Sequence, residues 1–358
     1  MLIIFVFVGV LSCDKGDDPK TTTLEYDDTP LELNIGNLPE PAWPEDNKLT
    51  VAGVELGTLL FYETLLSKDG SQSCGSCHEQ ADGFSDSDKF SEGVEGEFGK
   101  RQAMPIFNMA WHDNQFFWDG RANLLRDQAL KPIQDPLEMN ETLENVVEKL
   151  SNSPIYPDRF MRAFGSIEVT DVKISLALEQ FMMSIISADS KYDKFLAGTE
   201  QLSDSEERGR LLYETEYNPF FPSQSGADCA HCHGGSNFEN DEYMNNGLDT
   251  DADMVDIGRE DVTGLPEDRA KFKVPSLRNI EVTAPYMHDG RFTTLEEVVN
   301  HYNEGINESS SVDPAILTTK QTGLMLTDED KVDLINFLKT LTDQQFLSNQ
   351  SHSNPFTQ

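Results

Sequence analysis

The sequence is poor in cysteine, tryptophan, histidine and positive charge. Its 358 residues include five Cys, three Trp and seven His, and 27 Lys and Arg stand against 64 Asp and Glu. The resulting net charge of −37, with no basic cluster, argues against a nucleic-acid partner. An acidic surface is instead suited to a basic protein partner, or simply keeps the protein soluble.

Long apolar runs are also scarce, and the one at residues 2–12 is too short to cross a bilayer. It is typical of the core of a secretory signal, although a positive n-region is missing. The sequence Val-Leu-Ser-Cys ending at Cys13 resembles a bacterial lipobox. We therefore predict a lipoprotein signal at 1–13, with a plain signal or a buried segment as the alternative, and a flexible polar tether at 14–30.

Four of the five cysteines occur in two copies of one motif. Cys-Gly-Ser-Cys-His occupies 74–78 and Cys-Ala-His-Cys-His occupies 229–233. Cys-x-x-Cys-His is the attachment site of a c-type haem, in which both thiols form thioethers and the histidine binds the iron. A redox disulfide or half of a zinc site would not explain a histidine after both pairs. The predicted haem-binding residues are Cys74, Cys77, His78, Cys229, Cys232 and His233.

Helical periodicity dominates the rest of the chain, and strand-like alternation is rare. Apolar stretches predict helices near 54–61, 143–150, 172–186 and 295–302 and another after Thr327, with Asn140, Ser203, Thr294 and Thr327 as candidate caps. Gly-Thr-Leu-Leu-Phe-Tyr-Glu at 57–63 recurs as Gly-Arg-Leu-Leu-Tyr-Glu at 209–214. The predicted fold is mainly α, with two cytochrome c-like haem domains related by an internal repeat.

Further motifs carry a resemblance that covers most of residues 50–342. They are Phe-Trp-Asp-Gly-Arg-Ala at 117–122, Pro-Leu-Glu-Met at 136–139, Val-Pro-Ser-Leu-Arg-Asn at 274–279 and Ala-Pro-Tyr-Met-His-Asp-Gly at 284–290. With both haem motifs in the same order, the chain resembles the bacterial dihaem cytochrome c peroxidase family and its MauG-like branch. The resemblance implies a peroxidatic haem domain at 31–165, an electron-transfer haem domain at 166–346, and a tail at 347–358.

The resemblance also assigns roles around the first haem. Glu138 matches the distal acid–base group, Gln128 a distal glutamine, and Trp118 a relay between the haems; the alternatives are a solvated glutamate, an exposed glutamine and a packing aromatic. No histidine lies between His78 and His112, so we expect the first haem to be five-coordinate or water-bound. His112 is the only nearby histidine that could block the iron instead, but we expect it to be a surface residue ahead of Asp113 and Asn114.

The second haem differs from that of the peroxidases in its sixth ligand. Tyr302 stands where the peroxidases have methionine and the MauG type has tyrosine, and its helical spacing places it on the face of Leu295, Val298 and Val299. Met287 and Met325 are the alternative ligands. The resemblance further implies a calcium ion between the domains, held at Gln102, Thr283 and Pro285, with glutamine replacing the family's asparagine.

Three functions remain open at this stage. The first is reduction of hydrogen peroxide with electrons from a small cytochrome c or cupredoxin. The second is MauG-type oxidation of a protein or organic substrate by peroxide-derived high-valent haems. The third is a dihaem electron carrier, which the open first haem and Glu138 disfavour. Export of c-type haem proteins places the chain on the periplasmic side of the envelope, anchored through Cys13, and a homodimer is left open.

Overall fold

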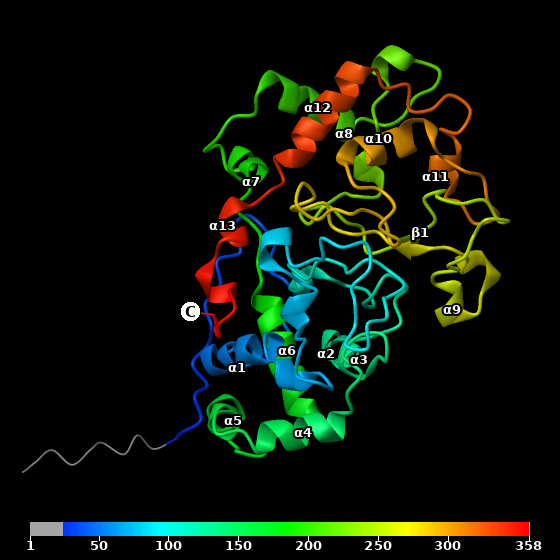
Figure 1. The fold of residues 1–358 in the computed structure, drawn as a ribbon. Coiled ribbons are helices and arrows are strands. Elements are labelled where there is room, and N and C mark those ends of the chain that lie inside the picture. The colour runs from blue at the N-terminus through cyan, green and yellow to red at the C-terminus, as the bar shows by residue number, and fades with distance from the viewer. Residues whose placement is uncertain (1–23, 358) are drawn as a thin grey trace, which may run out of the picture.

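The computed structural model describes residues 24–357, which form two helical lobes (Figure 1). The first lobe contains α1 (Val51–Phe61), α2 (Leu125–Ala129), α3 (Lys131–Gln134), α4 (Leu143–Ser151), α5 (Tyr156–Phe164) and α6 (Asp171–Ser184). The second contains α7 (Lys191–Leu196), α8 (Asp204–Glu214), α9 (Glu260–Thr263), α10 (Leu295–Glu304), α11 (Pro314–Leu317) and α12 (Asp328–Lys339). In this part of the chain β1 (Tyr243–Met244) and β2 (Phe272–Lys273) form one short antiparallel pair. The mainly α prediction is confirmed.

Local sequence signals set most helix starts correctly. Ser203, Thr294 and Thr327 each cap a helix, and each forms a capping box with the residue three positions later. The prediction that Asn140 caps α4 is wrong. Thr142 takes that role by accepting a hydrogen bond from the backbone N–H of Asn145, because Asn140 lies in the preceding loop with φ of +47°.

In each lobe a glycine lies where two helices pack closely against each other. A Cβ at Gly57 of α1 would lie 2.1 Å from the Ala177 carbonyl oxygen of α6, and one at Gly209 of α8 would lie 2.0 Å from the Asp333 carbonyl oxygen of α12. These glycines are equivalent in the two similar sequence stretches, so both stretches have the same packing role. The internal repeat itself stays a prediction.

We expect Gly57→Ala and Gly209→Ala each to destabilise the protein by about 1–3 kcal/mol. The added methyl group meets backbone atoms that cannot rotate away, and this strain exceeds the gain of about 1 kcal/mol in helix propensity. Denaturant titration of the holoprotein measures the effect. Glu55→Ala on the exposed side of α1 is the control, with an expected change below about 1 kcal/mol. Unchanged midpoints in both glycine variants would contradict the close packing.

The core of the first lobe extends further along the chain than the predicted boundary at 165/166. Buried residues of α6, among them Ile174, Leu178 and Phe181, belong to the same apolar cluster as α1, whereas the second cluster begins at Tyr192. A helix that buries its apolar face in one core belongs to that core, so we infer a boundary between Ile185 and Tyr192.

The end of the chain, from the last residues of the predicted second domain through the predicted tail at 347–358, packs against the first lobe. After α12, the chain returns beside that lobe, where α13 (Gln344–Leu347) lies (Figure 1). Phe346 joins the first core at 3% exposure, and Tyr62 donates a hydrogen bond from its hydroxyl to the carbonyl of His352 at 2.7 Å. The two lobes are therefore joined twice, before α7 and after α12.

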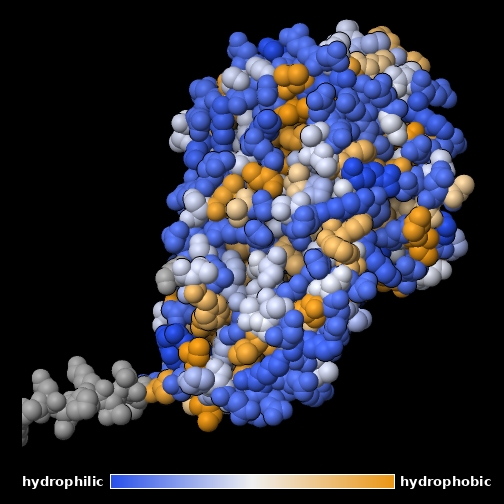
Figure 2. Space-filling model, viewed as in Figure 1, coloured by the Kyte–Doolittle hydropathy of each residue, from blue (hydrophilic) through white to orange (hydrophobic). Residues whose placement is uncertain are grey.

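The visible face of the molecule is mostly hydrophilic, with apolar residues scattered across it (Figure 2). Acidic side chains far outnumber basic ones over the whole sequence. Among residues 24–357, no helix has both the length and the apolar character needed to span a bilayer. The predicted signal, Cys13 and the start of the tether lie outside the described residues.

Candidate active site

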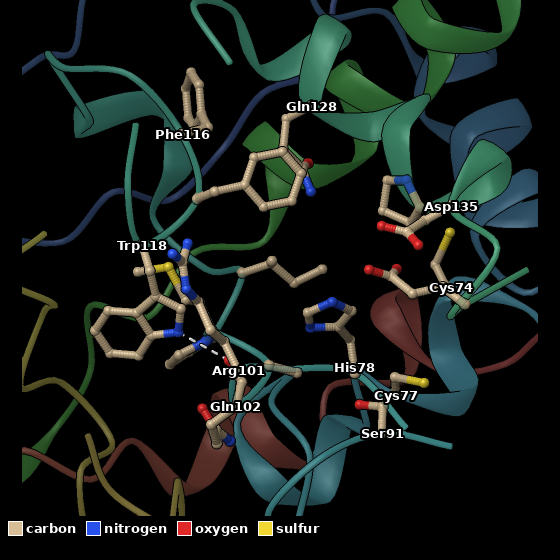
Figure 3. Close-up of a pocket in the computed structure, with 18 of the residues that line it drawn as sticks. Cys74, Cys77, His78, Ser91, Arg101, Gln102, Phe116, Trp118, Gln128 and Asp135 are labelled. Carbon is tan, nitrogen blue, oxygen red and sulfur yellow. Dashed lines mark hydrogen bonds between the residues drawn. The ribbon is translucent and has the colours of Figure 1, made fainter. Parts of the chain in front are cut away.

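The first Cys-x-x-Cys-His motif borders a cavity of about 1000 Å³ that is lined mainly by the first lobe and closed on one side by residues of the second. Cys74 begins a single 3₁₀ turn that follows α1, and Cys74, Cys77 and His78 all line the cavity (Figure 3). The Nδ1 atom of His78 lies 2.9 Å from the carbonyl oxygen of Phe84. That contact fixes the ring and leaves Nε2 to bind a metal, as in haem proteins with a proximal histidine.

The electrostatics of the four thiols argue against a redox disulfide. Burial raises the pKa of Cys74 and Cys229 to about 12, and it raises the pKa of Cys77 and Cys232 to about 11. Redox-active Cys-x-x-Cys pairs have lowered pKa values, so these thiols have the opposite character. Both pairs instead face a cavity together with a histidine, which is the arrangement required for thioether attachment.

Glu138 is held at the wall of the first cavity by backbone hydrogen bonds. Its N–H donates to the carbonyl of Asp135 at 3.0 Å, and its carbonyl accepts from the N–H of Val94 at 2.9 Å. Burial, followed by the nearby Asp135 carboxylate, raises the pKa of Glu138 to about 7, against the opposing effect of Arg121. A carboxyl group with this pKa can both take up and release a proton near neutral pH.

Gln128 projects from α2 into the same cavity, with its amide facing the side occupied by His78 (Figure 3). Phe116 lies to the left of Gln128 and above Trp118 in this view. The expectation that His112 is a surface residue is wrong. Its side chain is only 7% exposed, borders the cavity, and places Nδ1 3.2 Å from Oε1 of Glu239. That partner is 127 residues away in sequence and belongs to the segment after the second haem motif, so local sequence gave no signal of it.

Trp118 lies in a wall shared by the first cavity and a second one in the other lobe. It is 8% exposed, and its indole N–H donates to the carbonyl of Gln102 at 2.8 Å (Figure 3). It packs in a small apolar cluster with Phe272, whose ring stacks on His288 with centroids 3.6 Å apart. An aromatic side chain therefore separates the two cavities at this point.

The second Cys-x-x-Cys-His motif borders the second cavity in an equivalent way. Cys229 begins a 3₁₀ turn, and the Nδ1 atom of His233 lies 3.0 Å from the Pro275 carbonyl, leaving Nε2 available. The side chains of Tyr302 on α10 and of Met287 both line this cavity, whereas Met325 does not. Leu295, Val298 and Val299 share the cavity-facing side of α10 with Tyr302, as their spacing predicted.

One polar side chain reaches both of the candidate ligands. The Asn246 amide nitrogen lies 3.2 Å from the Tyr302 hydroxyl oxygen and 3.3 Å from the Met287 sulfur. Burial raises the pKa of Tyr302 to about 12, and the hydrogen bond from Asn246 opposes this shift. Asn246 was missed from the sequence because it lies in an irregular segment outside the recognised motifs.

Lys273 provides a test of whether the cavities fit haem. It is 2% exposed and lines both cavities, and its ammonium nitrogen has no hydrogen-bond partner among residues 24–357. A buried ammonium group requires a nearby anion, and a haem bears two propionates. The orphaned ammonium, the paired thiols and the oriented histidines therefore fit a propionate-bearing group. The signal in the sequence was the position of Lys273 directly before the 274–279 motif.

The proposed calcium residues also lie around the second cavity, which all three of Gln102, Thr283 and Pro285 border. The Gln102 side-chain amide donates to the Asp86 carbonyl at 3.1 Å, which leaves its Oε1 as the remaining polar atom of that group. The Gln102 backbone carbonyl is already occupied by the indole of Trp118. The glutamine side-chain oxygen is therefore free for a cation, and the backbone carbonyl retains one lone pair.

Comparisons with known proteins agree with this site. The family model for di-haem cytochrome c peroxidase matches residues 51–201. The chain is 36% identical over 294 residues to the cytochrome c551 peroxidase of Nitrosomonas europaea, covering 81% of this chain and 80% of that protein. It is 34% identical over 300 residues to the methylamine utilization protein MauG of Methylorubrum extorquens, covering 83% and 80%.

Solved structures show the same fold. A MauG-like protein associated with microbial copper homeostasis superimposes with a TM-score of 0.81 at 33% identity, covering 89% of this chain and 97% of that one. The diheme peroxidase of Burkholderia thailandensis gives 0.71 at 21% identity, covering 92% and 98%. The chain belongs to the di-haem cytochrome c peroxidase family, which implies two c-type haems. It is an oxidoreductase that acts on peroxide.

Proposed function

We propose that hydrogen peroxide reacts in the first cavity and that Glu138 is the acid–base group of this reaction. The observation that carries the proposal is the position of Glu138, which shares a cavity with Cys74, Cys77 and His78 and has a pKa of about 7. When bound, the first haem would supply an iron that binds peroxide and accepts its oxidising equivalents. Glu138 takes the proton from one peroxide oxygen and returns it to the oxygen that leaves.

Gln128 orients the peroxide in this proposal. Its amide carries both donors and an acceptor, and its side chain reaches the cavity from α2 without a hydrogen-bond partner in the described part of the chain. Trp118 connects the two sites, because its indole borders both cavities. A haem held at His233 would accept electrons from a small redox protein, a cytochrome c or a cupredoxin, and Trp118 would pass them on to the first site. The net charge of −37 favours a basic donor.

A second candidate function is MauG-type oxidation of a protein or organic substrate. Tyr302 favours it, because the phenol oxygen lies on the cavity face of α10 and a phenolate ligand stabilises the higher oxidation states of iron. In this second function a substrate would be oxidised at the second site, whereas in the first function a redox protein would donate electrons there. Steady-state turnover with peroxide and reduced cytochrome c distinguishes the two: fast turnover supports the peroxidase, and slow turnover with a long-lived oxidised state supports the MauG type.

Two further assignments are a bound calcium ion and the location of the protein in the cell. We place a calcium ion between the lobes at Gln102, Thr283 and Pro285, since oxygen donors suit this hard cation. We also place the protein on the periplasmic side of the envelope, anchored by a lipid on Cys13. The composition of the leader supports this, as does the need to attach c-type haem outside the cytoplasm. Metal analysis and a labelled fatty acid test the two assignments.

We expect Trp118→Phe to slow the delivery of electrons from the second site to the first by roughly tenfold or more, equivalent to about 1.4 kcal/mol of barrier. Phenylalanine preserves the packing with Phe272 but is much harder to oxidise than indole. Stopped-flow measurements should show an unchanged initial reaction with peroxide and a slower second phase. Trp111→Phe is the matched control, because its indole bonds to the Pro39 carbonyl near the surface. Equal rates in both variants would remove Trp118 from the electron path.

A further inference from the structure

The wall of the second cavity holds one amide between two competing ligands. The Asn246 amide nitrogen lies 3.2 Å from the hydroxyl oxygen of Tyr302 and 3.3 Å from the sulfur of Met287. Tyr302 comes from α10, and Met287 comes from the loop before it, at φ of +74°. Both side chains line the cavity that contains His233. A single donor group is thus in reach of the oxygen and of the sulfur that could occupy the sixth position.

The backbone around Asn246 is fixed by contacts on the side away from the cavity. The His301 ring nitrogen Nε2 lies 3.0 Å from the Asn246 carbonyl oxygen. The next residue, Gly247, adopts φ of +70°, and a Cβ there would lie 2.8 Å from Ile306. The Gly247 carbonyl accepts a hydrogen bond from the N–H of Asn307 at 2.8 Å. These contacts hold the turn against α10 and the segment that follows it, so the position of the amide is set by the fold.

The two hydrogen bonds have different chemical consequences. An N–H group that donates to a ligand oxygen stabilises negative charge on that oxygen, which strengthens its binding to ferric iron. A thioether sulfur is a weak acceptor with two lone pairs, so an N–H group that donates to one pair holds the sulfur toward Asn246 and withdraws electron density from the pair left for iron. Both contacts therefore favour the oxygen ligand over the sulfur ligand.

We propose that Asn246 is a positioning residue that selects Tyr302 over Met287 as the sixth ligand of the second haem. The inference rests on the proposed function in which Tyr302 is that ligand. Loss of the amide would free the Met287 sulfur and weaken the oxygen ligand together. The identity of the ligand then depends on a side chain that does not itself touch the iron.

The experiment compares the holoproteins of the wild type and Asn246→Ala by visible spectroscopy and redox titration. In Asn246→Ala we expect at least a tenfold increase in the fraction of methionine-ligated haem, seen as a band at about 700 nm, and a raised potential of the second haem. Asn246→Ser, which retains a donor, should restore part of the wild-type spectrum. Asn300→Ala is the matched control, because Asn300 lies on α10 and contacts Lys331 instead of the cavity.

Two further comparisons, one with a double variant and one with Tyr302→Phe, test whether Asn246 acts through these two ligands. Adding Met287→Leu to Asn246→Ala should abolish the new band, and a band that persists would overturn the proposal by implicating another sulfur, such as that of Met244. If Tyr302→Phe alters the spectrum while Asn246→Ala leaves spectrum and potential unchanged, the selection by Asn246 is wrong and the tyrosine ligand stands. If Tyr302→Phe also leaves the spectrum unchanged, the proposed ligand fails, and the selection fails with it.

Discussion

Replacing Glu138 by glutamine is expected to lower kcat/KM for hydrogen peroxide by about 10²–10⁴-fold, the usual contribution of a positioned acid–base group. Glutamine has nearly the same shape, so the loop between Asp135 and Met139 should keep its backbone hydrogen bonds. What it loses is the ability to accept a proton. Single-turnover reaction of the holoprotein with peroxide measures the loss directly.

The same residue should set the pH dependence of the reaction. Burial and the carboxylate of Asp135 raise the pKa of Glu138 to about 7, so the group is protonated below that pH and cannot act as the base. We therefore expect kcat/KM to rise by about tenfold per pH unit below pH 7 and to level off above it. Asp135→Asn removes the like charge, which should lower the pKa of Glu138 and move the rising part of the pH profile to lower pH.

Matched variants separate this role from a general loss of stability. Glu144→Gln changes an exposed carboxylate in the first turn of α4 and should leave the rate and its pH profile unchanged. In Glu138→Gln the rising part of the profile near pH 7 should disappear together with the rate, while the haem content stays the same. A Glu138→Gln protein that consumed peroxide at the wild-type rate would exclude this residue from the mechanism.

Replacing Tyr302 by methionine is expected to raise the potential of the second haem on the order of 0.1–0.3 V, within the range of about 0.8 V that axial ligands cover. Sulfur stabilises the ferrous state, whereas an anionic oxygen stabilises the ferric state. The side chain at 302 already faces the cavity with His233, so methionine can occupy the same direction. Spectroelectrochemical titration gives the shift.

A second tyrosine of the same cavity supplies the control for this variant. Tyr286 also lines the cavity, but its hydroxyl donates to the Ile280 carbonyl at 2.8 Å and so already has a partner in the backbone. Tyr286→Phe should leave the potential of the second haem nearly unchanged. Similar shifts in both variants would indicate a general effect of polarity in the cavity and contradict ligation by Tyr302.

Features that depend on neighbouring residues were predictable from the sequence. The two haem motifs, the caps at Ser203, Thr294 and Thr327, and the cavity-facing side of α10 follow from spacing alone, because each is decided within one or two turns of chain.

Features that depend on distant partners were not predictable in this way. The burial of His112 depends on Glu239, and the assignment of α6 to the first core depends on its packing against α1. Lys273 and Asn246 carry no periodic signal, so only the folded chain shows that both border a cavity. Sequence reasoning thus located the predicted haem attachment points and, through the recognised motifs, Glu138 and Gln128, but it missed Lys273 and Asn246.

The return of α13 to the first lobe constrains how the protein matures. The first core is incomplete until Phe346 has joined it, although its other helices end at residue 184. Lobes that depend on late residues cannot finish folding in the order in which they are synthesised. We therefore expect the first lobe to be still open after its cysteines have emerged, which would give the first porphyrin time to enter before the lobe closes.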